Sequence, residues 1–436
     1  CSMQRRSLAI SIILLLAATG RARASTDING LFDSRSHALG GTGVAYLDSA
    51  GAIPTNPALL DQIGKLTLGL DVFYIRSQPE APYTIYHIDP ATGQTYRNYE
   101  TIRSKPTGAP LPFLGGAYRV SDHVVLGAAV YPVIGQGAQA EYRPAPEQYP
   151  NSISKVDVAM GLIEAGIPIS VRLLDNLSLG IMWRVTYMTQ SVSTPLPSIM
   201  APGAVINTAT GEVVNAEIKA SGMNFSGIQL GLFYKPLPNL RFGFSYRAKV
   251  TVEGTGTTTT QIGPSTIVLD TTQGYSNPHA FRAGLAWTGL DDRLMLAADF
   301  KYLLYGEAFK ELGTTTTQAG KPPSTAYTKA YWKNSFSFHA GAEYRIAEGW
   351  HARMGYAIVT SATNPDYAIS YFAPPGNAHQ FFGGVGIKIF DSLTMDIAAG
   401  YVVLTSKVDT ATEYNAGAGI YGSHSFEVSE TITFHL

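Results

Sequence analysis

Basic side chains recur at alternate positions of several apolar segments, and they are the residues best suited to binding chemistry. Between Leu240 and Val250, Arg and Lys alternate with Leu, Phe and Tyr. Guanidinium and ammonium groups on one face can bind a carboxylate through charge-assisted hydrogen bonds. The alternative is a structural network, because buried charges usually pair with one another. The candidate groups for binding a ligand carboxylate are Arg241, Arg247, Lys249, Arg345 and Arg353.

No other set of residues has the spacing of a catalytic, metal or cofactor site. The histidines stand singly, as at His37 and His339, whereas zinc ligands typically come in close pairs. The glycine cluster from Gly40 to Gly43 lacks the βαβ unit that a dinucleotide loop requires. No motif supplies a nucleophile with a base and an orienting group. The sequence therefore predicts no metal, no cofactor and no enzymatic activity.

Amphipathic β-strands are the elements that must position these side chains. Period-two alternation of apolar and polar residues recurs in fourteen segments, an even number, as in bacterial outer-membrane barrels. The predicted strands cover residues 65–77, 112–120, 123–133, 156–172, 177–193, 216–235, 239–252, 279–289, 293–306, 333–346, 350–360, 379–390, 393–406 and 424–436.

The connections between these strands alternate in length. Tight turns such as Ser121-Asp122 alternate with long connections rich in Thr, Pro, Gly and Tyr, such as 78–111 and 253–278. Short turns on one rim and long loops on the other are typical of outer-membrane barrels, with the short turns in the periplasm. The expected fold is all-β, a fourteen-stranded antiparallel transmembrane β-barrel with both termini at the periplasmic rim.

Composition favours a membrane barrel and argues against a nucleic-acid partner. Only 14% of the 436 residues are charged, the formal net charge is -1, and there are 25 tyrosines. An apolar outer face with aromatic girdles has such a composition, whereas nucleic-acid binding needs a basic surface. Beyond residue 24, no apolar run reaches the length of a membrane helix. A closed barrel is the other structure that satisfies its backbone hydrogen bonds in lipid.

The N-terminal part divides into two segments. Residues 1–24 have a basic start, a short apolar core and an A-x-A cleavage site, which together predict a signal peptide. Residues 25–64 are rich in small residues and do not alternate, so we expect a small hatch that plugs the barrel of residues 65–436. This segment contains the tripeptide Asn56, Pro57 and Ala58, for which a simple turn is the alternative.

Three stretches carry recognisable motifs. They are GGTGVAYLDSAGAIPTNPALL, PFLGGAYRVSDHVVLGAAVYPVIG and WKNSFSFHAGAEYRIAEGWHARMGYAI. The first resembles the N-terminal hatch of the FadL/TodX family of outer-membrane transporters for hydrophobic compounds, including its Asn-Pro-Ala motif. The second resembles the second and third strands of that family, and the third a later strand pair. The resemblance covers nearly the whole mature chain.

The resemblance implies a barrel closed by a hatch, with Asn56, Pro57 and Ala58 at the gate. In that family, cargo is caught among extracellular loops, enters an internal pocket and leaves sideways into the bilayer where the third strand is kinked. Pro132, followed by Gly135, lies at the outer end of the third predicted strand, and proline removes a donor from the ladder. We therefore expect the lateral opening there.

Several cargoes and roles agree with the sequence. Long-chain fatty acids are the first expected cargo, aromatic hydrocarbons are the alternative, and a surface receptor or adhesin is a third possibility. Tyrosines of the long connections, such as Tyr83, Tyr367 and Tyr371, can form a landing groove for an apolar ligand or belong to the interfacial girdle. The expected setting is the Gram-negative outer membrane, with outer-membrane lipid, lipopolysaccharide and the assembly machinery as partners of a monomer.

Overall fold

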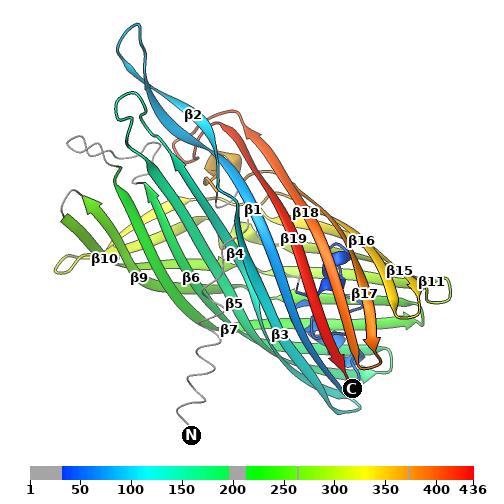
Figure 1. Cartoon of the computed structure of the whole chain (residues 1–436). Coiled ribbons are helices and arrows are strands. Elements are labelled where there is room, and N and C mark those ends of the chain that lie inside the picture. Colours follow the sequence, from blue (N-terminus) through cyan, green and yellow to red (C-terminus); the bar gives the residue numbers. More distant parts are fainter. Residues whose placement is uncertain (1–31, 196–212, 263–264, 372–373) are drawn as a thin grey trace.

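One antiparallel sheet closes on itself in the computed structural model, which describes residues 32–195, 213–262, 265–371 and 374–436. Closure occurs where β1 (Leu66–Ile88) pairs with β19 (Gly419–His435), the first and last strands. Figure 1 shows these two strands side by side in the wall of the barrel. Because these two strands pair, neither the first nor the last strand of the sheet leaves a free edge in lipid.

Nineteen strand segments among the described residues make fourteen barrel strands. Three pairs, β2/β3, β8/β9 and β10/β11, are successive parts of one strand each, and β13 and β14 form a hairpin beyond the rim. The prediction of a closed, fourteen-stranded antiparallel barrel is confirmed. The remaining segments are β2 (Thr95–Arg103), β3 (Thr107–Ser121), β4 (Val124–Tyr142), β5 (Ser154–Leu174), β6 (Leu177–Pro195), β7 (Asn215–Leu237), β8 (Leu240–Arg247), β9 (Val250–Ile262), β10 (Ser265–Asn277), β11 (Ala280–Gly289), β12 (Leu294–Leu303), β13 (Glu311–Thr317), β14 (Ser324–Lys329), β15 (Ser335–Ala347), β16 (Trp350–Val359), β17 (Ala378–Phe390) and β18 (Leu393–Val408).

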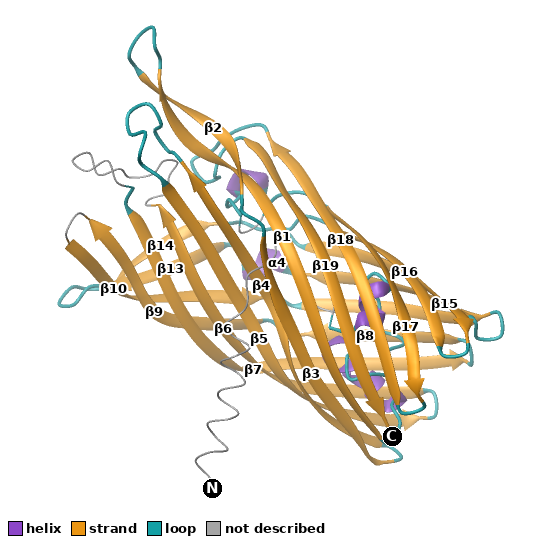
Figure 2. Ribbon diagram, in the orientation of Figure 1, coloured by secondary structure: helices purple, strands orange, loops and turns teal. Residues whose placement is uncertain are grey.

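The two rims of the barrel differ as predicted. Short turns, such as those after β3, β15 and β17, lie at the rim that carries the C-terminus, and the long connections lie at the other rim (Figure 2). Three predicted connections contain hairpins instead of irregular loops: β1 with β2, β9 with β10, and β13 with β14. These connections are rich in Thr and Tyr, which favour strands, so the ladder continues beyond the membrane.

The predicted strand over 239–252 is interrupted in the structure. β8 ends at Arg247 and β9 begins at Val250, and the neighbouring β6–β7 ladder shifts register beside this point. The interruption moves the alternation by one residue. Val250 and Val252 are therefore buried inside, and Lys249 is exposed. The prediction that Lys249 shares the inner face with Arg247 is wrong.

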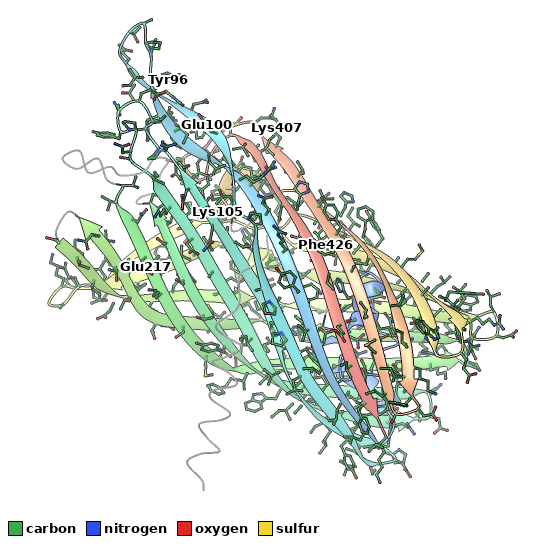
Figure 3. The ribbon with its side chains drawn as sticks, in the orientation of Figure 1. Tyr96, Glu100, Lys105, Glu217, Lys407 and Phe426 are labelled. Atoms are coloured by element: carbon green, nitrogen blue, oxygen red, sulfur yellow. The ribbon has the colours of Figure 1, made fainter. Side chains whose placement is uncertain are left out.

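The outer wall is apolar and the inner wall is mixed. Along β1, Leu68, Leu70 and Val72 are between 43% and 48% exposed, whereas Thr67 and Asp71 are fully buried. Phe426 of β19 lies on the outer surface in Figure 3 and is 52% exposed. An apolar outer face is stable in contact with lipid hydrocarbon, because exposing it to water instead would cost about 25 cal/mol of free energy per Å² of apolar surface. Among the described residues, no helix has the length and hydropathy to cross a membrane.

A compact helical segment, residues 32–64, lies inside the barrel (Figures 1 and 2). It contains α2 (Ser34–Ala38), α3 (Ala52–Thr55) and the 3-10 helix η1 (Pro57–Gln62), and almost all of it is buried. Asp33 caps α2 by accepting a hydrogen bond from the backbone N–H of Ser36 at 3.0 Å, and burial raises the pKa of its carboxyl. We call residues 32–64 the inner segment. The predicted signal peptide, 1–24, and residues 25–31 of the predicted hatch lie outside the described residues.

Candidate transport path

An apolar cavity of about 170 Å³ lies inside the barrel near the rim with the long connections. Its walls come from the outer parts of β1, β4, β5, β6, β7 and β10, from the β13–β14 hairpin and from two loop segments, 368–371 and 413–416. The larger side chains in its lining are Tyr83, Tyr142, Met160, Ile218, Tyr275, Leu312, Tyr371 and Tyr414.

The lining of the cavity is mostly apolar and uncharged, and it contains five tyrosines. Tyr83 packs against Tyr142 and Tyr371, with ring centroids 4.8 and 5.4 Å apart. The Tyr371 hydroxyl donates to the backbone carbonyl of Ile102 at 3.0 Å, so this ring is fixed in place. Glu413 is the one ionisable acid among the described lining residues, and none of them is Arg, Lys or His. Such a site suits a neutral apolar molecule with an aromatic ring.

Tyrosines continue from the cavity to the outer surface. Tyr414 stacks on Tyr367 with centroids 5.3 Å apart, and Tyr367 meets Tyr331 at 4.9 Å. The ammonium group of Lys329 lies over the Tyr414 ring, 4.4 Å from its centroid. Two of the tyrosines expected in a landing groove, Tyr83 and Tyr371, line the cavity, and Tyr367 belongs to this stack. The stack offers an apolar ligand a series of ring faces leading inward.

The ladder between β3 and β4 is open over part of its length. Its pairing runs from Ser121 opposite Val124 to Leu114 opposite Val130 and ends there. Farther out, β3 still pairs with β1 and β4 still pairs with β5. The opening is bounded at its outer end by a bridge between Lys105 and Gln139 and by the Thr107 hydroxyl, which donates to the carbonyl of Gly137 at 3.1 Å; Lys105 is labelled in Figure 3. We call this opening, between 107–113 of β3 and 131–138 of β4, the β3–β4 gap.

Three prolines explain why the ladder opens here. Pro132 lies in β4, where the β4–β5 register shifts between Pro132 and Ile134. Pro110 and Pro112 lie on the opposite lip, in β3. None of the three has an N–H to donate across the gap, and proline in a strand is tolerated at such edges. From the sequence, Pro132 and Gly135 were predicted at the opening, but Pro110 and Pro112 were not. Pro110 falls in the predicted connection 78–111, and Pro112 is the first residue of the predicted strand 112–120, where proline is ordinarily tolerated.

The cavity lies next to the gap. Val156 and Val158 of β5 line the cavity and pair with Ala140 and Ala138 of β4. Ala138 is 2% exposed and packs in one apolar cluster with Tyr83 and Tyr142 of the cavity wall. One strand edge therefore separates the cavity from the lipid-facing side of the gap.

Asn56 holds the inner segment to itself and to the barrel wall. Its side-chain amide donates to the carbonyls of Val44 at 2.8 Å and of Leu232, in β7, at 3.0 Å. Its side-chain oxygen accepts from the backbone N–H of Ala58 at 3.1 Å, which caps η1, and Pro57 begins that helix. The tripeptide Asn56, Pro57 and Ala58 thus lies where the inner segment meets the wall.

Two glycines of the wall allow this close contact. A Cβ atom at Gly180 of β6 would collide with the backbone of Pro57 and Ala58, and one at Gly231 of β7 would collide with Asn56. Ser170 of β5 completes the seat by donating to the Ala58 carbonyl at 3.1 Å. Glycine spacing in the strands was the signal that could have located this seat from sequence.

The basic candidates for a carboxylate site do not gather around the cavity. Arg247 and Arg353 are buried in ion pairs with Glu164 at 2.9 Å and Glu343 at 2.6 Å. The others lie apart from one another: Arg241 is half-buried, Lys249 is exposed, and Arg345 donates to the carbonyl of Asp291 near a short turn. None of the five is among the described residues that line the cavity. Carboxylate binding by them stays a prediction.

Acidic side chains of the wall instead bind the inner segment. Glu343 receives hydrogen bonds from Arg35 at 2.8 and 2.9 Å, and Asp299 accepts from the backbone N–H groups of Gly43 and Val44 at 2.9 and 3.2 Å. The charges are reversed at Asp61 of the inner segment, which pairs with Arg119 of β3 at 3.2 Å. Within the described part of the chain, no group of His, Cys, Asp and Glu has the arrangement of a metal site.

Comparison with known proteins places this architecture in a family. The model of the family described as "Outer membrane protein transport protein (OMPP1/FadL/TodX)" matches residues 17–433. No curated protein sequence matches the chain. A FadL homologue of Pseudomonas aeruginosa is similar in structure, with a TM-score of 0.73 at 17% identity, covering 96% of this chain and 100% of its own.

Two further solved structures have the same fold. The Pseudomonas putida toluene transporter TodX gives a TM-score of 0.70 at 16% identity, over 94% of this chain and 99% of its own. The Ralstonia pickettii toluene transporter TbuX gives 0.65 at 18% identity, over 92% and 97%. Since the family model covers nearly the whole chain, this β-barrel protein belongs to the OMPP1/FadL/TodX family of outer-membrane transport proteins.

Proposed function

We propose that this protein carries neutral, ring-sized hydrophobic molecules from the cell surface into the outer membrane. The observation that carries the proposal is the apolar cavity of about 170 Å³ beside the β3–β4 gap. An apolar cavity of about 150 Å³ is large enough to hold benzene. Solved relatives of the same fold are described as toluene transporters, which supports an aromatic cargo.

The proposed route has three stages. Cargo is first captured on the tyrosine stack of Tyr331, Tyr367 and Tyr414, then enters the cavity, and finally leaves through the β3–β4 gap at Pro132 and Gly135. Burial of a ring of roughly 150 Å² gains about 4 kcal/mol relative to water. Transfer from an apolar cavity into lipid costs little, because both surroundings are apolar. Each transfer, from water to cavity and from cavity to bilayer, is therefore favourable or nearly neutral in free energy.

The inner segment is the proposed hatch of the barrel. It fills the part of the barrel next to the short turns, and Asn56, Pro57 and Ala58 connect it to β5, β6 and β7. A fourteen-stranded barrel without a plug would leave an aqueous channel. We assign to these three residues the role of keeping the hatch closed while cargo leaves sideways, into outer-membrane lipid.

Long-chain fatty acids are the second candidate cargo. Lys329 at the mouth favours them, because its ammonium group can meet a carboxylate while an acyl chain enters the cavity. The described lining of the cavity supports them less well, since it holds Glu413 and no basic residue. A receptor or adhesin role would use the long connections, but it would not explain why an apolar cavity lies beside the gap.

Substitution of Met160 by tryptophan tests the cavity directly. Met160 is 2% exposed and lines the cavity from β5, so the larger ring should fill the space that cargo needs. Losing half of the roughly 4 kcal/mol that burial of the cargo ring contributes would lower the occupancy of the cavity by cargo at least about tenfold. We expect uptake of labelled toluene at low concentration to fall accordingly in cells that produce Met160→Trp.

Ile167→Trp is the matched control, because Ile167 lies on the same strand with its side chain on the opposite, outer face and pairs with Trp183 of β6, not with the residues at the β3–β4 gap. Its uptake should equal that of the wild type at equal surface amounts. Labelled oleate, measured in the same cells, separates the two cargo classes. Toluene uptake that Met160→Trp leaves unchanged would contradict the proposed function.

A further inference from the structure

One cluster of charges inside the barrel makes its direct ion pairs and hydrogen bonds with barrel strands alone. It consists of Glu164 on β5, Arg184 on β6 and Arg247 on β8, all at most 6% exposed. The charges described above, such as Asp299 and Glu343, bind the inner segment. The cluster reaches the inner segment indirectly: Arg247 donates to the side-chain oxygen of Gln229 at 3.4 Å, and the Gln229 amide donates to the carbonyls of Pro54 and Thr55 at 3.1 and 3.3 Å.

The bonds of the cluster are short and nearly complete. Glu164 accepts from Arg184 at 2.7 Å and from Arg247 at 2.9 and 3.0 Å. Arg184 also donates to the carbonyls of Ile228 at 3.1 Å and Ala248 at 2.8 Å, where the strands are interrupted. Buried pairs of this kind are costly to break, because one partner is left charged and alone. The cluster is thus a rigid polar body on the inner wall of the barrel.

Along the length of the barrel, the cluster lies between the inner segment and the cavity. Along β5, Ser170 touches Ala58 of the inner segment, Glu164 holds the cluster, and Met160 lines the cavity. Along β6, Gly180 contacts the inner segment, Arg184 belongs to the cluster, and Gln190 lines the cavity. Both strands therefore present the same order of layers on their inner faces.

The cluster also reaches the edge of the β3–β4 gap. The Tyr131 hydroxyl donates to Glu164 at 3.0 Å, and Tyr131 precedes Pro132 at the lip of the gap. Tyr131 is fully buried, and its ring meets that of Phe32 of the inner segment at 6.3 Å. A molecule that moves down from the cavity along β4 and β5 thus meets charges below it and the gap beside it.

We infer that the cluster of Glu164, Arg184 and Arg247, with Tyr131, is a charged sill that turns apolar cargo from the cavity toward the β3–β4 gap and away from the inner segment. An apolar molecule cannot replace the hydrogen bonds of these groups, so it gains nothing by entering between them. Tyr131 acts as a positioning residue that joins the sill to the lip. This inference rests on the proposed function, and it assigns to the cluster the role of directing cargo to the β3–β4 gap.

Photolabelling with a phenyl diazirine, a neutral single-ring probe, tests the sill in the purified, lipid-reconstituted protein. In the wild type we expect label in the cavity peptide around 156–160 and at the gap around 131–138, with background label only in residues 32–64. In the triple variant Glu164→Leu, Arg184→Met and Arg247→Met, label should appear in residues 32–64 as well. Apolar residues of similar size often replace a buried ion pair without loss of stability.

The matched control is Lys219→Met with Glu217→Leu, which removes an exposed ion pair of 2.6 Å on β7 and should keep the wild-type pattern. Label in residues 32–64 of the wild type would overturn the sill without any need for the variant. A folded triple variant with the wild-type pattern would overturn it as well. Absence of label from the wild-type cavity would instead refute the proposed function, so the two failures are distinguishable.

Discussion

Closing the β3–β4 gap is expected to reduce uptake of a neutral aromatic compound by about tenfold or more. The variant is Pro110→Thr, Pro112→Val and Pro132→Val, which restores a backbone N–H at each of the three positions on the two lips. A ladder hydrogen bond contributes about 1 kcal/mol net, so three can favour a closed ladder by about 3 kcal/mol. Each 1.4 kcal/mol is about tenfold in an equilibrium. Uptake of labelled toluene by intact cells measures the effect.

Pro168→Val is the matched control for this variant. Pro168 also lies within a strand, β5, but opposite Met182 in the intact β5–β6 ladder. Its replacement should leave uptake at the wild-type level. The closed variant should bind the probe in its cavity as before, because its cavity wall is unchanged. Wild-type uptake by the triple proline variant would show that cargo leaves by another route.

Asn56→Asp is expected to loosen the inner segment and make the barrel leaky. Asn56 is fully buried, and its amide donates to the carbonyls of Val44 and Leu232. The aspartate carboxylate has the same shape but no hydrogen to donate, so one of its oxygens would face the two carbonyl oxygens without a hydrogen bond. A buried polar group left unpaired costs about 1–3 kcal/mol, and more when it is charged. We expect larger single-channel conductance in planar bilayers and greater entry of large antibiotics into cells.

The same substitution at an exposed position controls for charge alone. Asn98 lies in the exposed hairpin strand β2, far along the chain from the inner segment, and Asn98→Asp should conduct as the wild type does. Gly180→Val gives a second route to the same loosened state, since its side chain would collide with Pro57 and Ala58. Wild-type conductance in Asn56→Asp would contradict the role of Asn56 in holding the hatch closed.

The barrel could be predicted from sequence because its signal is repeated in every strand. Alternation such as that of Leu68, Leu70 and Val72 against Thr67 and Asp71 needs no knowledge of the partner strand. The prediction failed where a local irregularity shifts the alternation, as between Arg247 and Val250. Those irregularities depend on contacts with neighbouring strands, in particular Arg184 with the carbonyl of Ala248. The alternation of apolar and polar residues within one strand cannot predict such contacts between strands.

The candidate site was less accessible to prediction. Pro132 could be found because proline removes a donor wherever it stands, but the gap needs the second lip at Pro110 and Pro112 as well. The cavity joins side chains from distant positions, such as Tyr83, Ile218 and Tyr414, which only the closed sheet brings together. Basic residues were predicted to bind a ligand, yet Arg247 and Arg353 are engaged by Glu164 and Glu343.

Lateral release is tested most directly by blocking the gap from the lipid side in one and the same protein. Pro110 lies exposed on the lip in β3, so Pro110→Cys, with Cys1 replaced by Ser, gives a single reactive position there. Uptake of labelled toluene is measured before and after reaction with a bulky, membrane-permeant thiol reagent. Ile167→Cys, on the outer face of β5 and 52% exposed in the wild type, is the control. We predict that the reagent abolishes uptake through Pro110→Cys and leaves Ile167→Cys unaffected; undiminished uptake through fully modified Pro110→Cys would contradict release through the gap.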